Sequence, residues 1–196
     1  MSHPGPRPFS TRRLDALPLD PSYADEMAVV LADPALYVFT GGEPPEPAAL
    51  RARYERQCAG PPEPGEVWSN WVLRVRAEGR LAGYVQATVR EGRVEIAWVV
   101  GAAWQGRGYA KEAVAGLATH LIAPVGDGDS EGGDTEGGDT GDDDAEGGRP
   151  GEVRTLVAHI HPEHAASCAV AASAGLAPTG EWEDGERRWQ RDGPGA

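Results

Sequence analysis

Residues Val94 to Val114 read V-E-I-A-W-V-V-G-A-A-W-Q-G-R-G-Y-A-K-E-A-V and join two different hydrophobic patterns. The run up to Val100 is short and apolar, as is typical of a strand, whereas the apolar positions after Gly108 recur at helical spacing. The pattern therefore predicts a strand, a glycine-rich turn and a helix, in that order.

The turn between this strand and this helix has the composition of an anion-binding site. A helix N-terminus leaves several backbone N–H groups without partners and carries a partial positive charge. Glycines let an anion approach the backbone closely, so the expected ligand is a phosphate or pyrophosphate. An ordinary glycine-containing loop is the alternative. The candidate residues are Gln105, Gly106, Arg107, Gly108, Tyr109 and Ala110, and Arg107 could add a side-chain charge.

Two better-known phosphate loops do not fit this turn. A Walker loop ends in G-K-[ST], which does not occur here. A dinucleotide fingerprint needs G-x-G-x-x-G within a parallel βαβ unit. The strand ending at Val100 is instead expected to close a three-strand antiparallel meander with turns at Glu78-Gly79 and Glu91-Gly92. The alternation predicts that Val67, Trp71, Leu73 and Val75 share one face, and that Leu81, Val85, Ala87 and Val89 share another.

The rest of the chain alternates strands and helices around this centre. The expected elements are a strand over 11–19, helices over 20–32 (with Asp20 as N-cap) and 47–59, a strand over 153–160, a helix ending near Ala174, and a hairpin at Asp184-Gly185. The prediction is one mixed α/β domain over 11–191, with a central, mostly antiparallel sheet of about seven strands flanked by helices.

The net charge of −13 is concentrated in one segment, residues 126–151, which holds ten acidic residues and one arginine. We expect a disordered insertion in a surface loop, because the segment is rich in glycine and has no aliphatic or aromatic side chain to bury. A calcium-binding repeat is the alternative, but its longer period and regular aliphatic position are missing. Residues 1–10 and 192–196 are expected to be a flexible N-terminus and a tail.

Composition also limits the class of protein. With 40% hydrophobic and 25% charged residues the chain resembles a globular domain. Its acidic balance and the lack of a basic stripe argue against nucleic-acid or membrane partners. The N-terminus shows no secretory signal, and Cys58 and Cys168 form neither a disulfide framework nor a zinc motif, so a cytoplasmic location is expected.

The sequence resembles the GCN5-related N-acetyltransferases (GNAT superfamily), and within them the RimJ/RimL-type group that acetylates ribosomal-protein N-termini. The hallmark [RQ]-x-x-G-x-[GA] is met by Gln105, Gly108 and Ala110. The likeness extends to T-R-R-L near the start, D-P-A-L after the first helix, and H-P-E-H-A-A-S with a later G-L, and it covers about residues 11–190. It implies the acyl-CoA N-acyltransferase fold.

The resemblance further implies acetyl-CoA as co-substrate, with its pyrophosphate on the amides of residues 105–110. The pantetheine arm would lie between the fourth and fifth strands, pairing near Val99 and Val100, and the Val99 N–H would stabilise the thioester oxygen. An amine then attacks the thioester directly, and Glu95 is the candidate base, acting through water. The alternative is that Glu95 is a solvent-facing strand residue.

Two positions depart from the family pattern. The usual asparagine at the start of the last core helix is His164, although the serine three residues later is retained as Ser167. The usual tyrosine that protonates the departing thiolate is Ala171. We expect His164 and Ser167 to contact the cofactor. Either Ser167 or a water protonates the thiolate, or it leaves unassisted, since a thiol has a pKa of about 8.5.

Other residue groups have simpler interpretations. His159, His161 and His164 could suggest a metal, but no fourth ligand is evident, so no metal is expected. Trp68, Trp71, Trp98 and Trp104 could line an acceptor pocket but fit core positions better, and Cys168 is expected to be buried rather than nucleophilic. The acceptor would be a small-molecule amine or a protein N-terminus, and the enzyme a monomer or homodimer. The alternatives are an acyl-CoA-binding sensor without transfer activity and a calcium-responsive interaction protein.

Overall fold

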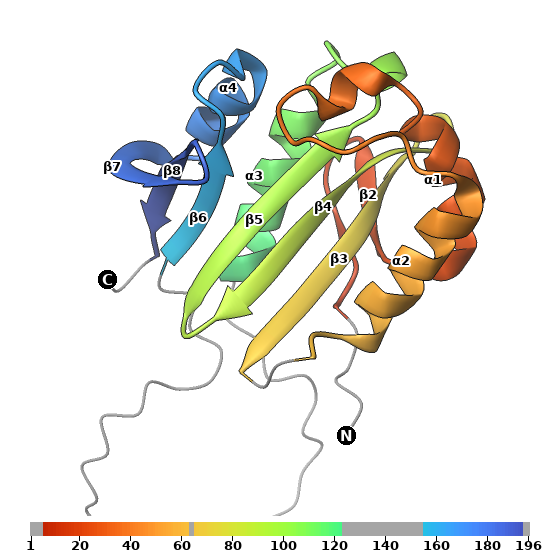
Figure 1. Cartoon of the computed structure of the whole chain (residues 1–196), viewed down its shortest axis with the longest axis horizontal. Coiled ribbons are helices and arrows are strands. Elements are labelled where there is room, and N and C mark those ends of the chain that lie inside the picture. Colours follow the sequence, from red (N-terminus) through yellow and green to blue (C-terminus); the bar gives the residue numbers. More distant parts are fainter. Residues whose placement is uncertain (1–5, 63–64, 123–154, 194–196) are drawn as a thin grey trace, which may run out of the picture.

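The computed structural model describes residues 6–62, 65–122 and 155–193. Its centre is one eight-stranded sheet in the order β1-β2-β3-β4-β5-β6-β8-β7, in which only the β5–β6 pair is parallel (Figure 1). The strands are β1 (Phe9–Ser10), β2 (Leu14–Pro18), β3 (Glu66–Val75), β4 (Arg80–Arg90), β5 (Arg93–Val100), β6 (Thr155–Ile160), β7 (Ala177–Glu183) and β8 (Glu186–Asp192). The expected mixed α/β fold with a mostly antiparallel sheet is confirmed, and the acidic segment 126–151 lies outside the described residues.

Helices cover both faces of the sheet and divide the core in two. One apolar cluster joins the sheet to α3 (Tyr109–Ile122) and α4 (Ala165–Ser173). The other joins it to α1 (Ala24–Val30) and α2 (Pro47–Ala59). Short 3-10 turns lie at Pro21–Tyr23, Pro34–Tyr37 and Ala102–Trp104. Within the described parts of the chain, no helix is long and apolar enough to cross a membrane.

The start of the chain is more ordered than its proline-rich sequence predicts. The single expected strand over 11–19 is two strands, because the chain reverses at Arg12-Arg13 and β1 pairs with β2. Phe9 packs edge-on against Trp71, and the Trp71 Nε1–H donates to the Arg7 carbonyl (2.8 Å). Part of the segment 1–10, expected to be flexible, is thus held on the sheet and adds the eighth strand.

The expected first helix begins as predicted but is not continuous. The Asp20 carboxylate caps it by accepting from the Ser22 N–H at 2.8 Å. Pro21–Tyr23 then form a 3-10 turn before α1. The second helix, α2, has the bounds predicted for it.

A register shift in β4 overturns one predicted face. Leu73 of β3 pairs with Gly83, and the next residue, Arg74, pairs with Leu81, so Ala82 is an extra residue on β4. A bulge of this kind reverses the alternation beyond it. Leu81 therefore belongs to the α1–α2 cluster, whereas Val85 and Ala87 pack towards α3. On β3, Val67 shares the side of Trp71, as predicted, but lies near the start of the strand and is exposed.

The parallel pair at the centre of the sheet is short. It runs from Arg93 opposite Thr155 to Glu95 opposite Val157, and no pair follows between the described residues of the two strands. The C-terminal halves of β5 and β6 diverge, as Figure 1 shows. This divergence opens a backbone edge of β5 immediately before the glycine-rich turn, in the place between the fourth and fifth strands where the pantetheine arm is expected.

Candidate active site

The glycine-rich turn presents a run of backbone donors. Gly106 and Gly108 have positive φ angles of 74° and 79°, which L residues other than glycine rarely adopt. The first backbone bond of α3 joins the Glu112 N–H to the Gly108 carbonyl at 3.1 Å. For the six N–H groups of residues 106–111, no backbone or side-chain acceptor occurs among the described residues. Such a run at a helix N-terminus suits an anion with several oxygens.

The end of β5 holds this turn in place. The Gln105 Nε2 donates to the Val100 carbonyl at 3.0 Å, which links the first residue of the turn to the end of the strand. Trp104 and Tyr109 are buried in the core on either side. The motif residues Gln105, Gly108 and Ala110 are therefore brought together. The N–H groups of Gly108 and Ala110 have no acceptor among the described residues, whereas the Gln105 N–H donates to the Ala102 carbonyl at 3.2 Å, and the Tyr109 ring serves packing.

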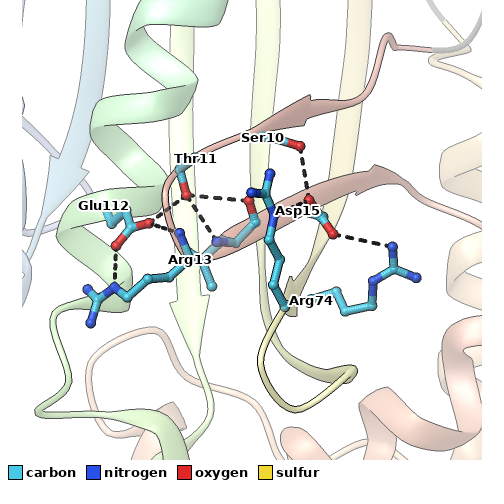
Figure 2. A network of polar contacts seen from close by, with 8 residues as sticks. Ser10, Thr11, Arg13, Asp15, Arg74 and Glu112 are labelled. Atoms are coloured by element: carbon cyan, nitrogen blue, oxygen red, sulfur yellow. Dashed lines mark hydrogen bonds and ion pairs between the residues drawn. The ribbon is translucent and has the colours of Figure 1, made fainter.

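A second set of bonds ties the first turn of α3 to the N-terminal hairpin (Figure 2). The Glu112 carboxylate accepts from the Arg13 N–H and Nε (both 2.6 Å) and from the Thr11 hydroxyl (2.7 Å). Arg13 also donates to the Arg107 carbonyl at 2.9 Å and lies over the Tyr109 ring at 4.7 Å. Burial alone would raise the pKa of Glu112, but these hydrogen bonds lower it below its usual value. Arg13 and Glu112 therefore hold the turn in place. The sequence analysis named Arg13 only as part of the T-R-R-L likeness and predicted no role for Glu112.

The Arg107 side chain is engaged away from the turn. Its guanidinium pairs with Glu78 at 3.2 Å and lies over the Trp104 ring at 5.3 Å. Arg107 therefore presents its backbone N–H to the turn, and its charge is partly neutralised by Glu78.

The backbone of β5 faces alternately to β4 and to the open edge. The Gly101 N–H donates to the Ala82 carbonyl at 2.9 Å, and the Val99 carbonyl would collide with a Cβ placed on Gly83, so both residues face β4. The Val99 N–H therefore also faces β4, contrary to the role expected for it. By alternation, the N–H groups at the open edge belong to Trp98 and Val100.

Glu95 lies beside a histidine on the exposed face of the sheet. His159 of β6 is within 2.9 Å of Glu95 through Nδ1 and within 3.2 Å of Glu183 of β7 through Nε2. The His159 side chain is 16% exposed, whereas those of Glu95 and Glu183 are 54% and 70% exposed. The result is a carboxylate–imidazole–carboxylate chain beside the point where β5 and β6 separate.

Further acids surround this chain. Burial raises the pKa of Glu186, an effect that His159 and His161 oppose and that Glu95 and Asp184 strengthen. In the sequence, Glu183 and Asp184 belong to the final hairpin, where acids could favour a cationic amine acceptor but are also common on any surface. They meet Glu95 only because β8 pairs with β6, placing Arg188 opposite His159.

The start of α4 contacts the loop after the second 3-10 turn. The His164 ring stacks on Phe39 with centroids 4.5 Å apart, and the His161 ring lies 5.2 Å from the same phenyl ring. Burial lowers the pKa of His164, and His161 lowers it further. Ser167 follows in the first turn of α4 and is half-buried, and its hydroxyl has no hydrogen-bond partner among the described residues. Ala171 is fully buried in the core.

The remaining candidates take other positions. The three histidines do not converge, because His159 contacts two carboxylates, whereas His164 stacks on Phe39 and His161 lies tilted against the same ring. No cluster suited to a metal ion occurs among the described residues. Trp71 and Trp104 are core residues, and Cys168 is partly buried against the α3–α4 core.

Comparisons with known proteins agree with this geometry. A family model described as acetyltransferase (GNAT) domain matches residues 13–177. No curated protein sequence is significantly similar to the chain.

Solved structures of similar fold include three relevant examples. RimL, a ribosomal L7/L12 alpha-N-protein acetyltransferase in complex with coenzyme A, is 15% identical with a TM-score of 0.68 over 95% of this chain and 98% of that one. The microcin C7 self-immunity acetyltransferase MccE, in complex with acetyl-CoA and AMP, is 14% identical with a TM-score of 0.62 over 93% of each chain. A spermidine N-acetyltransferase SpeG chimera from Vibrio cholerae and hSSAT is 12% identical with a TM-score of 0.62 over 92% and 95%. These likenesses show the fold, and the family model, which matches most of the chain, shows that this protein belongs to the GNAT acetyltransferases.

Proposed function

We propose that this acetyltransferase moves the acetyl group of acetyl-CoA to a primary amine, carried by a small molecule or a protein N-terminus, within a ternary complex. The observation that supports this most strongly is the run of N–H groups at residues 106–111, for which the described residues supply no acceptor. A diphosphate has enough oxygens to use several such donors at once.

The residues present fit coenzyme A. The turn from Gly106 to Lys111 would hold the diphosphate through backbone N–H groups, with its two glycines leaving the approach clear. The open edge of β5 would hold the pantetheine amides through the backbone of Trp98 and Val100. His164 and Ser167, at the start of α4, would border the same path.

Bound acetyl-CoA supplies an acyl carbon that an amine can attack. Its carbonyl oxygen gains negative charge during attack, and a backbone N–H at the open edge of β5 can stabilise that charge. Trp98 and Val100 replace Val99 in this role, because the Val99 backbone faces β4. Binding both substrates along one strand also orients them for reaction.

An ammonium must lose a proton before it can attack, and Glu95 is the proposed acceptor of that proton. The carboxylate is exposed, so it can act directly or through water, and the His159 ring beside it offers an onward path towards Glu183. Together with the nearby Glu186, the carboxylates of Glu95 and Glu183 would attract a cationic amine to this part of the sheet.

The departing thiolate needs little help. Ala171 is buried in the core and carries no proton donor, so the family's usual tyrosine has no replacement at that position. Ser167 has an uncommitted hydroxyl among the described residues and is the proposed donor, directly or through water. A thiol pKa of about 8.5 also permits departure without assistance near neutral pH.

A second candidate function is an acyl-CoA-binding sensor without transfer activity, and the buried Ala171 favours it. One experiment separates the two. Calorimetry with CoA is combined with thiol release from acetyl-CoA over a panel of amines and peptide N-termini. Binding with release supports the transferase, and binding without release by any acceptor supports the sensor. Absence of binding would contradict both.

A further inference from the structure

A small cavity between α2 and the sheet has no role in the steps above. Its volume is about 70 Å³, and it opens on the face of the sheet that carries Glu95. Residues of α2, β3 and β4 line most of it. The lining residues that matter most are Arg53, Tyr54, Gln57, Asn70 and Gln86.

One lining group is buried without a partner. The Tyr54 side chain is only 3% exposed, and its hydroxyl forms no well-aligned hydrogen bond among the described residues, although the Arg53 guanidinium lies close to it. Burial raises the pKa of Tyr54 to about 12, while the nearby Arg53 guanidinium opposes that shift. A buried hydroxyl is costly to leave unpaired, so an orphaned one beside a cavity indicates a missing ligand group.

The charge balance of the cavity is also uneven. Arg53 is its only charged lining residue, and no carboxylate of the described residues pairs with it. The Gln86 Nε2 donates to the Asn70 Oδ1 at 2.6 Å, which fixes the Asn70 amide and leaves its own N–H donors for the cavity. A guanidinium, a phenol and an amide together provide donors that match the two oxygens of a carboxylate.

The sheet register sets the distance from this cavity to the reaction centre. Gln86 pairs with Ala97 and Thr88 pairs with Glu95, so these four side chains share one face. Asn70, on β3, lies two strands from β5. With adjacent strands about 4.8 Å apart, the cavity lies roughly 10 Å from β5 across the sheet. Between the cavity and Glu95 the sheet carries only small side chains, the exposed Ala97 and the half-buried Thr88, so an extended acceptor could lie across it.

We propose that the Arg53–Tyr54–Asn70 cavity binds a carboxylate of the acceptor, on a molecule whose amine lies on the order of 10 Å away. This inference rests on the proposed transfer reaction and specifies its substrate class. The carboxylate can belong to a small amino acid or to an acidic residue near a peptide N-terminus, because either presents the same two oxygens.

Matched acceptor pairs test the proposal and distinguish these sources. The small-molecule pair is 8-aminooctanoate and 8-aminooctanamide, and the peptide pair is a tripeptide amide with aspartate or asparagine at its third position. Wild-type kcat/KM should favour the carboxylate member of at least one pair by roughly 10- to 100-fold, as expected for a charge-assisted contact. R53Q should reduce that preference to about 1, whereas R56Q, which changes an exposed arginine on the same helix, should retain it.

Y54F provides a second readout. It should lower the preference several-fold without lowering the thermal stability of the ligand-free protein, because the removed hydroxyl forms no well-aligned hydrogen bond there. Calorimetry with the same pairs in the presence of CoA separates this proposal from the transferase assignment. If binding shows the preference but no amine is acetylated, the cavity assignment stands and the transferase fails. If amines are acetylated with no preference for the carboxylate member of either pair, the cavity assignment is wrong. It is also wrong if R53Q shows the same carboxylate preference as the wild type.

Discussion

The two ends of the site are built differently. The turn presents the backbone N–H groups of residues 106–111 and is clamped by bonds from Gln105, Arg13 and Thr11, most of them partly buried. The face around Glu95 presents exposed side chains and is linked by a single histidine. A backbone site tolerates many side chains and recognises one constant ligand, whereas a side-chain site can change its acceptor by substitution. Variants at the two ends should therefore fail in different ways.

The largest effect should follow from breaking the clamp with E112A. The substitution removes three hydrogen bonds and leaves the Arg13 guanidinium without its carboxylate, at a cost of about 2–4 kcal/mol of unfolding free energy. CoA affinity should fall at least about tenfold, because the donors of the turn lose their fixed positions. Urea unfolding and calorimetry measure both. Unchanged stability and CoA affinity would show that the network does not hold the turn.

E95Q should change the rate and leave the cofactor end intact. Loss of a general base lowers kcat on the order of 100-fold, and the remaining rate should rise with pH as the free amine becomes more abundant. CoA affinity should match that of the wild type, since Glu95 lies away from the turn. Steady-state kinetics from pH 6 to 9 test this, and a wild-type rate profile would remove Glu95 from the mechanism.

H159N should have a smaller effect on the same step. Asparagine keeps a polar group at this position but cannot carry a proton between Glu95 and Glu183, so we expect kcat to fall about tenfold. The pH profile should change as well, and E183Q offers a milder control because Glu183 is more exposed. A change in KM alone would indicate that His159 only shapes the acceptor surface.

The clamp should also make stability depend on pH. The folded pKa of Glu112 is lowered, so its contribution is present above the unfolded pKa of about 4.3 and is lost as pH falls through the folded value. Wild-type protein should therefore lose more unfolding free energy below about pH 4.3 than E112A does. Parallel slopes for the two proteins in acid would contradict the assigned role of Glu112.

The smallest effect is expected for R107Q. Arg107 is half-exposed and pairs with Glu78, so its loss should alter stability by no more than about 1 kcal/mol. CoA affinity should change less than about threefold, because the turn uses the Arg107 backbone. A much larger loss in calorimetry would mean that the guanidinium leaves Glu78 to bind the cofactor.

Local signals in the sequence predicted the elements that depend on nearby residues. The bounds of α2, the meander and the glycine-rich turn all follow from periodicity, caps and turn residues within short windows. Strand β1 was missed, because its two residues are too few to show a strand pattern. It pairs with the neighbouring β2, and the Trp71 indole that holds it on the sheet is more than 60 residues away in the sequence. The β4 bulge was missed although Gly83, directly after the extra residue Ala82, is a local sign of one, because a glycine inside a strand pattern often marks a bulge or a close backbone approach.

The candidate site was predicted in the same uneven way. The turn is contiguous in sequence, so all its residues could be named, whereas the Val99 N–H was wrongly chosen because strand register decides which groups face the edge. The partners of Glu95 come from β6 and β7, and only sheet order brings them together. Arg53 was likewise an ordinary helix arginine until the fold placed it across a cavity from Asn70 and Gln86 of the sheet.

The most direct test of the account is the backbone amide spectrum of the protein, measured by NMR with CoA and with pantetheine, which lacks the diphosphate. With CoA, the amide signals of residues 106–111 should shift more than any others. Pantetheine should leave those signals in place and bind far more weakly. Equal binding of the two ligands, or shifts confined to other parts of the chain, would contradict the claim that these amides grip the diphosphate.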